Sequence, residues 1–197
     1  MRARLGHAPV STPLCAATRA DEPTGSLKGA RGAVIHRRMT LTGLMAQPPT
    51  LYEWAGGMPA FERLTEIFYR RVPTDALLGP LFAGMSPQHP QHVAAFIAEV
   101  FGGPKTYSEG LGGHAEMVRH HLGRKLTEEQ RRRWAGLIAE CADEAGLPSD
   151  PEFRSAFVAY LEWGSRIAVI NSQSGTPGPA APMPAWDWGV LGGPYRP

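Results

Sequence analysis

The sequence has few cysteines, little net charge and no long apolar run, and each absence excludes a class of protein. Its 197 residues include only two cysteines, Cys15 and Cys141, whose surroundings differ and predict no disulfide framework. The net charge of +2 argues against a dedicated nucleic-acid-binding protein. No stretch of about 18 apolar residues occurs, so no membrane-spanning helix is predicted. We therefore expect a cytoplasmic protein with neither a membrane nor a nucleic acid as its partner.

Apolar periodicity is missing at both ends of the chain. Residues 1–50 carry Arg, Gly, Ser, Thr and Pro without a sustained apolar period, which predicts an irregular N-terminal extension. They resemble neither a transit peptide nor a signal peptide, and we favour Met45 as the start of translation. Residues 172–197 are rich in Pro and Gly and predict a second irregular tail, in which Trp186 and Trp188 are candidates to dock on the domain.

The middle of the chain, residues 51–171, predicts a single all-α domain. Its apolar residues recur at helical offsets of three, four and seven, and no alternating strand pattern appears. Gly and Pro divide this stretch into about six helices of mixed length. Residues 105–113, which join two of these helices, are predicted to form a loop.

Local signals predict where two of the longer helices begin. Thr127 with Gln130, and Ser149 with Glu152, both match the capping-box pattern. The arginines at 131–133 follow the first of these boxes, and we interpret them as a solvated helix flank rather than a nucleic-acid patch.

One histidine stands out as a candidate ligand. If residues 114–121 form a helix, His121 shares an apolar face with Met117, while His120 points about a quarter-turn away. A histidine on such a face is most often an ordinary core residue. Here, however, five of the seven histidines fall between His89 and His121, among segments rich in large apolar side chains. This pattern suits a histidine that binds a large apolar cofactor through iron, as haem requires.

Several short motifs together resemble those of the group II truncated haemoglobins, a bacterial and plant branch of the globins. The resemblance covers roughly residues 51–171, and it implies a two-over-two helical sandwich around haem b, shorter than the eight-helix globin fold. The matching motifs are Phe68-Tyr69, Leu81-Phe82-Ala83-Gly84, the run from Val100 to Glu109, the spacing of seven from His114 to His121, and Trp134 thirteen residues later.

The resemblance also implies roles for individual residues. His121 would be the iron ligand, and Tyr69 and Trp134 would donate hydrogen bonds to a ligand on the iron. Dioxygen gains negative charge when it binds, so such donors would hold it by charge-assisted hydrogen bonds. His89 falls at the distal gate, where relatives often have Ala. Because Pro90 suits a first helical turn, His89 could instead cap that helix.

The remaining implied roles concern the cofactor. Relatives commonly have an arginine before the iron ligand that binds a haem propionate, but this sequence has His120 there. Arg119, Tyr107 and Lys105 are the candidate substitutes. The residues implied to line the haem pocket are Phe82, Val93, Phe96, Ile97 and Met117.

These patterns leave four functions open. The leading one is reversible binding of dioxygen and other diatomic ligands, such as carbon monoxide and nitric oxide. The second is redox catalysis at the same iron, by peroxide reduction or nitric oxide dioxygenation, with a reductase as partner. The third is a non-haem metal site that would use His89, His92, His120 and His121. The fourth is a helical interaction module without a cofactor. The sequence also leaves open whether the protein forms a homo-oligomer.

Overall fold

Helices form all the regular structure of the residues that the structure describes. This computed structural model describes residues 47–173, 175, 178 and 181–196. Short 3₁₀ turns at Val72–Thr74 and Gly189–Leu191 accompany the α-helices, so the all-α prediction is confirmed for these residues. The helices are α1 (Leu51–Ala55), α2 (Met58–Arg71), α3 (Gly79–Phe82), α4 (His89–Val100), α5 (Thr106–Gly110), α6 (Gly113–His121), α7 (Glu128–Glu144) and α8 (Pro151–Gln173).

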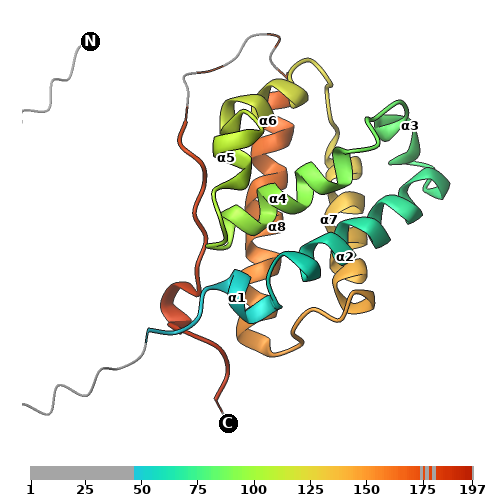
Figure 1. Ribbon diagram of the computed structural model, residues 1–197. Helices are drawn as coiled ribbons and strands as arrows, with labels where there is room; N and C mark the ends of the chain where they lie inside the picture. The colour runs from blue at the N-terminus through green and yellow to red at the C-terminus, as the bar shows by residue number, and fades with distance from the viewer. Residues whose placement is uncertain (1–46, 174, 176–177, 179–180, 197) are drawn as a thin grey trace, which may run out of the picture. The chain divides into compact units, whose positions relative to one another are not determined.

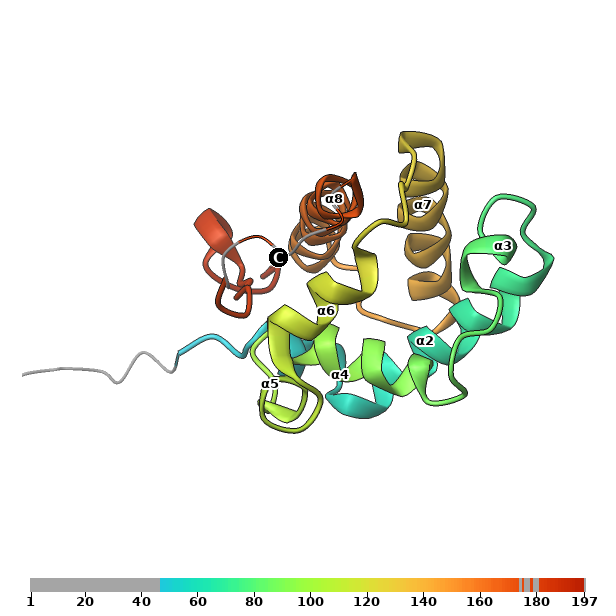
Figure 2. The ribbon, with the colours of Figure 1, turned by 90° about the horizontal axis from the view of Figure 1, so that it is seen from above.

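The four long helices form two layers, as expected for a two-over-two sandwich. Helix α2 packs on α4, and α7 packs on α8, while α2 also contacts α7 and α6 contacts α8 (Figures 1 and 2). Fully buried aromatic and aliphatic side chains from both layers fill the space between them. They include Phe61, Leu64, Phe68, Phe101, Leu137, Ile138, Phe153 and Phe157. None of the described helices combines the length and the apolar character that a membrane crossing requires.

The capping signals were right for α7 and one residue off for α8. Thr127 accepts a hydrogen bond from the backbone N–H of Gln130, whose side chain accepts one in return, so this capping box is confirmed. At α8 the backbone N–H of Phe153 donates to Asp150 Oδ1 at 3.0 Å. The predicted box of Ser149 and Glu152 is therefore wrong, because Asp150 lies directly before the first helical residue and takes the capping position.

Helix α5 contradicts the predicted loop over residues 105–113. The backbone N–H groups of Tyr107 and Ser108 both donate to Glu99 Oε2, at 3.0 and 2.9 Å. The carboxylate on α4 thus satisfies two of the free donors at the start of α5. This cap comes from another helix, so no local sequence pattern announces it.

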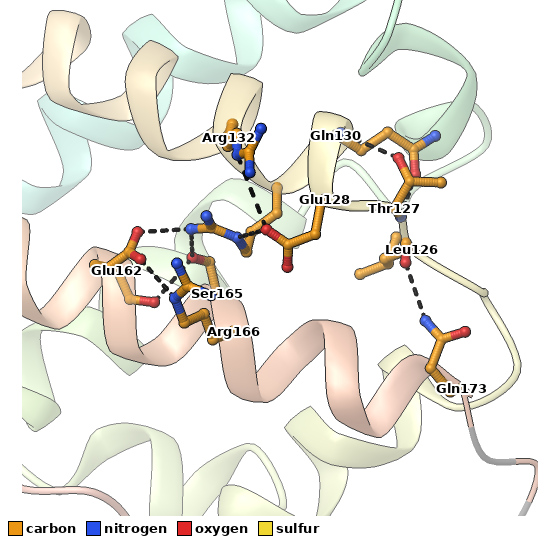
Figure 3. Close-up of polar contacts among 10 residues, drawn as sticks. Leu126, Thr127, Glu128, Gln130, Arg132, Glu162, Ser165, Arg166 and Gln173 are labelled. Atoms are coloured by element: carbon orange, nitrogen blue, oxygen red, sulfur yellow. Dashed lines mark hydrogen bonds and ion pairs between the residues drawn. The ribbon is translucent and has the colours of Figure 1, made fainter.

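The three arginines at the start of α7 do not form a solvated flank. Arg131 is only 6% exposed, and its guanidinium contacts Glu128 Oε2 at 2.9 Å and Glu162 Oε2 at 2.6 Å (Figure 3). Arg133 pairs with Asp75. Only Arg132, with 74% of its side chain exposed, behaves as predicted. The first turn of α7 is therefore held to α8 by ionic contacts.

The connection from α6 to α7 is also fastened to the end of α8. Leu126 donates its backbone N–H to Ser172 Oγ at 2.9 Å, and its carbonyl accepts from Gln173 Nε2 at 3.0 Å (Figure 3). Lys125 adopts a left-handed conformation with φ of 51° and donates its N–H to the Ser172 carbonyl. These bonds fix the chain that leads from His121 into α7.

The C-terminal tail docks on the domain through its two tryptophans. Residues 181–196 hold one 3₁₀ turn and otherwise no regular structure, while α8 continues to Gln173, two residues into the predicted tail. Trp186 Nε1 donates to the Ala156 carbonyl at 3.0 Å, and Trp188 Nε1 donates to the Pro49 carbonyl at 2.7 Å. The expectations for residues 1–44 and for Cys15 lie outside the described residues.

Candidate functional site

An apolar cavity lies between the two layers and receives side chains from α2 to α8. The empty space between its walls is about 1450 Å³, open mouth included. The sequence-predicted site residues that line it are Tyr69, Phe82, His89, Val93, Phe96, Ile97, Tyr107, Met117, His121 and Trp134.

His121 lies at the end of α6 with its ring in the cavity. Its Nδ1 atom is 2.8 Å from the Met117 carbonyl oxygen, one turn earlier on the same helix. A carbonyl can only accept, so Nδ1 carries the proton and Nε2 keeps its lone pair. Burial lowers the pKa of the ring below its ordinary value, although the bond to Met117 opposes this effect. The geometry therefore presents a neutral imidazole whose free nitrogen is Nε2, the usual arrangement of a metal-binding histidine.

His120 is adjacent in sequence but differs in its surroundings. Its side chain is 58% exposed, and its Nε2 lies 3.2 Å from a Glu116 carboxylate oxygen. The ring nitrogen that a metal would need is thus engaged at the surface. His120 also borders the cavity, so the two neighbouring histidines differ in exposure and in hydrogen-bond partner rather than in whether they reach it.

Two hydrogen-bond donors line the same cavity as His121. Tyr69 on α2 and Trp134 on α7 both pack edge-on against the Phe68 ring, with centroid distances of 5.1 and 6.2 Å. Neither the Tyr69 hydroxyl nor Trp134 Nε1 donates to any described residue. Burial raises the pKa of Tyr69 above its usual range, which keeps the phenol protonated. Both groups can therefore donate to a polar ligand in the cavity.

His89 faces the cavity and does not cap α4. It is the first residue of that helix, after Gln88 at the capping position. Its ring lies 5.3 Å from the Tyr69 ring and 6.3 Å from the Phe82 ring, measured between centroids. Burial lowers the pKa of His89 to about 4, helped by the positive charges of neighbouring histidines and of Arg124. The ring is therefore neutral near pH 7.

The basic residues that line the cavity, Arg124 and Arg131, are not ones that the sequence resemblance proposed. Arg119 forms an ion pair with Glu116 outside the cavity lining, and Lys105 is exposed and also outside it. Arg124 lines the cavity instead, and its Nε donates to the His120 carbonyl at 2.6 Å. Arg124 lies in the loop after α6, so helical periodicity could not predict that it lines the cavity. The only sequence signal was that a basic residue follows His121 by three positions.

Helix α8 and the C-terminal tail supply a wall that sequence reasoning assigned only to the core. This wall includes residues on the predicted apolar face of α8, together with one tail residue. Its members are Tyr160, Leu161, Trp163, Gly164, Ile167, Ala168 and Pro184.

These features fit haem better than a bare metal ion. Within the described part of the chain, no group of three or more His, Cys, Asp or Glu side chains is placed to hold a metal. A non-haem centre built on His89, His92, His120 and His121 is therefore not supported. A single imidazole with a free Nε2 in an apolar cavity suits a planar cofactor that brings its own metal ligands.

Comparisons of the sequence and of the fold with known proteins both match this chain to globins. Residues 50–163 match the model of the bacterial-like globin family. The group 1 truncated hemoglobin GlbN of Nostoc sp. (strain MUN 8820) is 40% identical over 103 residues, which are 51% of this chain and 82% of that protein. The group 2 truncated hemoglobin YjbI of Bacillus subtilis (strain 168) is 27% identical over 118 residues, or 60% and 87% of the two chains. The crystal structure of hemoglobin from Chloroflexus aurantiacus has a TM-score of 0.55 and 33% identity, and covers 61% of this chain and 97% of that one.

Proposed function

Because this chain belongs to the bacterial-like globin family, we propose that it is a haem protein that binds dioxygen and other diatomic ligands reversibly. One observation carries the proposal: His121 keeps a free Nε2 in the same apolar cavity where Tyr69 and Trp134 have unused donors. Family membership implies haem iron, whereas the ligand, haem type b and the role of each residue belong to the proposal.

The chain's own residues would hold and orient the cofactor. When bound, haem would supply an iron that can take a diatomic ligand. His121 would bind the iron through Nε2, with the Met117 carbonyl fixing the ring's orientation. Arg124 and Tyr107, both in the cavity lining, would hold the carboxylates of the cofactor. Val93, with its neighbours on α4, would keep water from the ligand.

We further propose that the chain belongs to group II of the truncated haemoglobins. The support is Trp134, which corresponds to the tryptophan typical of group II and is an indole donor on α7 that lines the same cavity as Tyr69. The relatives carry both group 1 and group 2 names, so relatedness alone does not decide between the groups.

A ligand titration tests this function. The reduced protein should bind oxygen and carbon monoxide with a one-to-one stoichiometry and release both when the gas is removed. A protein that loads with haem but is oxidised by the first addition of oxygen, without a stable ligand complex, would contradict reversible binding.

Redox catalysis is the alternative at the same site, and His89 is the observation that favours it. His89 borders the cavity and is neutral near pH 7, so it can accept a proton from peroxide there, while the burial that lowers its pKa to about 4 makes it a weaker base than an ordinary histidine. Such a cycle would need a reductase partner. A turnover assay with peroxide or nitric oxide and an external reductant separates the two functions, because a binding protein would show no sustained turnover.

His89 also predicts a spectroscopic change in the oxidised protein. Its neutral ring borders the cavity beside Tyr69 and Phe82. We expect the ferric protein to be six-coordinate and low-spin near pH 7, and the His89→Ala variant to be high-spin. Because protonation removes the lone pair, acidification towards the pKa of about 4 should give the wild type the same high-spin spectrum. A spectrum that is indifferent to the substitution would show that His89 only packs against its neighbours.

We propose that the functional domain does not need residues 1–44. The first described contacts of the domain are made by Pro49, which accepts from Trp188, and by Thr50, which caps α1. A chain that begins at Met45 keeps both and should retain haem and an unchanged melting temperature. A chain that begins at Leu51 loses both, and its melting temperature should fall by several degrees, since about 1 kcal/mol shifts a domain of this size by roughly 2–8 °C. A fall of that size in the Met45 chain would show that residues 1–44 stabilise the domain.

A further inference from the structure

The C-terminal segment Ala181–Trp188, which we call the strap, reaches the cavity from outside the family's shared sequence. The globin family match ends at residue 163. Pro184 of the strap nevertheless lines the cavity. Figure 2 shows the tail on the side of α8 opposite to α7, next to α5 and α6. The strap is thus an addition to the globin domain that borders its central site.

Trp186 joins the strap to both layers of the sandwich. Its backbone N–H donates to the carbonyl of Val100, the last residue of α4, at 2.8 Å. That carbonyl would otherwise lack a partner within its helix. The indole Nε1 donates to the Ala156 carbonyl on α8 at 3.0 Å. Two directed bonds from one residue therefore tie α4 to α8.

The indole ring of Trp186 also supports the cavity wall from behind. Its centroid lies 5.7 Å from the ring of Tyr160 and 5.7 Å from the ring of Trp163. Tyr160 and Trp163 both line the cavity. Loss of the Trp186 ring would remove an aromatic contact from both of these side chains.

The strap contacts the helix that carries His121 as well. His114, in the first turn of α6, places Nδ1 at 3.1 Å from the Ala181 carbonyl oxygen, and since that oxygen can only accept, the ring donates. At its other end, Trp188 is buried and bonded to Pro49. The strap is therefore anchored at both ends and in the middle, and it spans from α6 to α8.

We propose that the strap is a further part of the cofactor site, which closes the cavity between α6 and α8 and slows the escape of bound haem. This inference rests on the proposed function. An apolar cofactor stays bound while the surrounding wall keeps water from its faces. The strap contacts the walls formed by α6 and α8, and none of its described contacts involves Tyr69 or Trp134. It should therefore control how long haem stays without changing how long a ligand stays.

Transfer of haem to an excess of apomyoglobin measures this effect in the full-length ferric protein. Trp186→Ala removes both the ring and the indole donor and should speed haem transfer by about tenfold or more. Trp186→Phe keeps an aromatic ring but loses the bond to Ala156, so its haem-transfer rate should lie between those of the wild type and Trp186→Ala. Val190→Ser is the matched control, because Val190 lies in the same tail with a fully exposed side chain, and its rate should equal that of the wild type.

Oxygen dissociation from the same variants shows whether the effect is confined to haem retention. We expect an unchanged oxygen dissociation rate in all three. Equal haem-transfer rates in wild type and both Trp186 variants would overturn the proposal, and so would an oxygen dissociation rate that rises by the same factor as haem transfer. If Trp186→Ala does not fold, Trp186→Phe carries the test. A wild-type protein that takes up no haem would instead refute the proposed function itself.

Discussion

Replacing His121 with Ala should abolish stable haem binding, while His120→Ala should retain it. His121 lies in the cavity with Nδ1 bonded to the Met117 carbonyl and Nε2 free. His120 is mostly exposed and engages Glu116. Loss of a partner that merely orients a metal ligand typically costs about 10–100-fold in metal affinity, so loss of the ligand itself should cost more than about a hundredfold.

Haem titration of the apoprotein, followed by its visible absorbance, measures this change. His120→Ala is a matched control because it removes a neighbouring imidazole from the same turn of α6. Added imidazole should restore a His-type spectrum to His121→Ala, since the free ligand can occupy the space of the missing ring. Haem binding that survives in His121→Ala and fails in His120→Ala would reverse the assignment of the ligand.

Replacing Trp134 with Phe should speed oxygen release by about ten- to a hundredfold. The indole Nε1 has no described acceptor and lines the cavity, so it is free to donate to a bound ligand. A hydrogen bond to a charged group contributes about 1.5–3 kcal/mol, and each 1.4 kcal/mol is about tenfold in an equilibrium constant. In a pre-formed cavity the change should appear mainly in dissociation. Phenylalanine keeps a ring to pack against Phe68, which limits steric side effects.

Carbon monoxide and Tyr69 provide the controls for this experiment. Carbon monoxide carries less negative charge than oxygen when it binds, so its release from Trp134→Phe should change less. Tyr69→Phe should act in the same direction as Trp134→Phe. The double variant should fall short of additivity, because both donors serve one ligand. Equal effects on oxygen and carbon monoxide would show that Trp134 acts by steric gating and not by a hydrogen bond.

The family resemblance singled out Tyr69 and Val93 as site residues, and helical periodicity placed His121 on an apolar face. Tyr69, Val93 and His121 line one cavity because the apolar face of a helix is also the face turned to the interior. The start of α7 could be predicted as well, because the capping box of Thr127 and Gln130 uses groups only three residues apart. In each case the cause lies within a few positions of the residue concerned.

The failures at Arg131, α5 and Arg124 have the opposite property, because their causes lie on another element of the fold, whereas the predicted cap of α8 was off by one position. Arg131 is buried because Glu162, 31 positions later, pairs with it across α7 and α8. Helix α5 begins where it does because Glu99 reaches over from α4. Arg124 reaches the cavity from a loop that is fastened to the end of α8. The amino-acid sequence alone does not show which of these residues come together in the folded chain.

The absorbance spectrum of the purified, haem-loaded protein under reducing, oxygen-free conditions tests the central claim most directly. A single neutral imidazole with a free Nε2 predicts a strong Soret band with the pattern of five-coordinate ferrous haem bound to histidine, which shifts when carbon monoxide is added. A protein that shows no Soret band after incubation with haem would contradict the account. So would a spectrum that matches thiolate ligation, since Cys141, the cysteine that the structure describes, is buried and does not line the cavity.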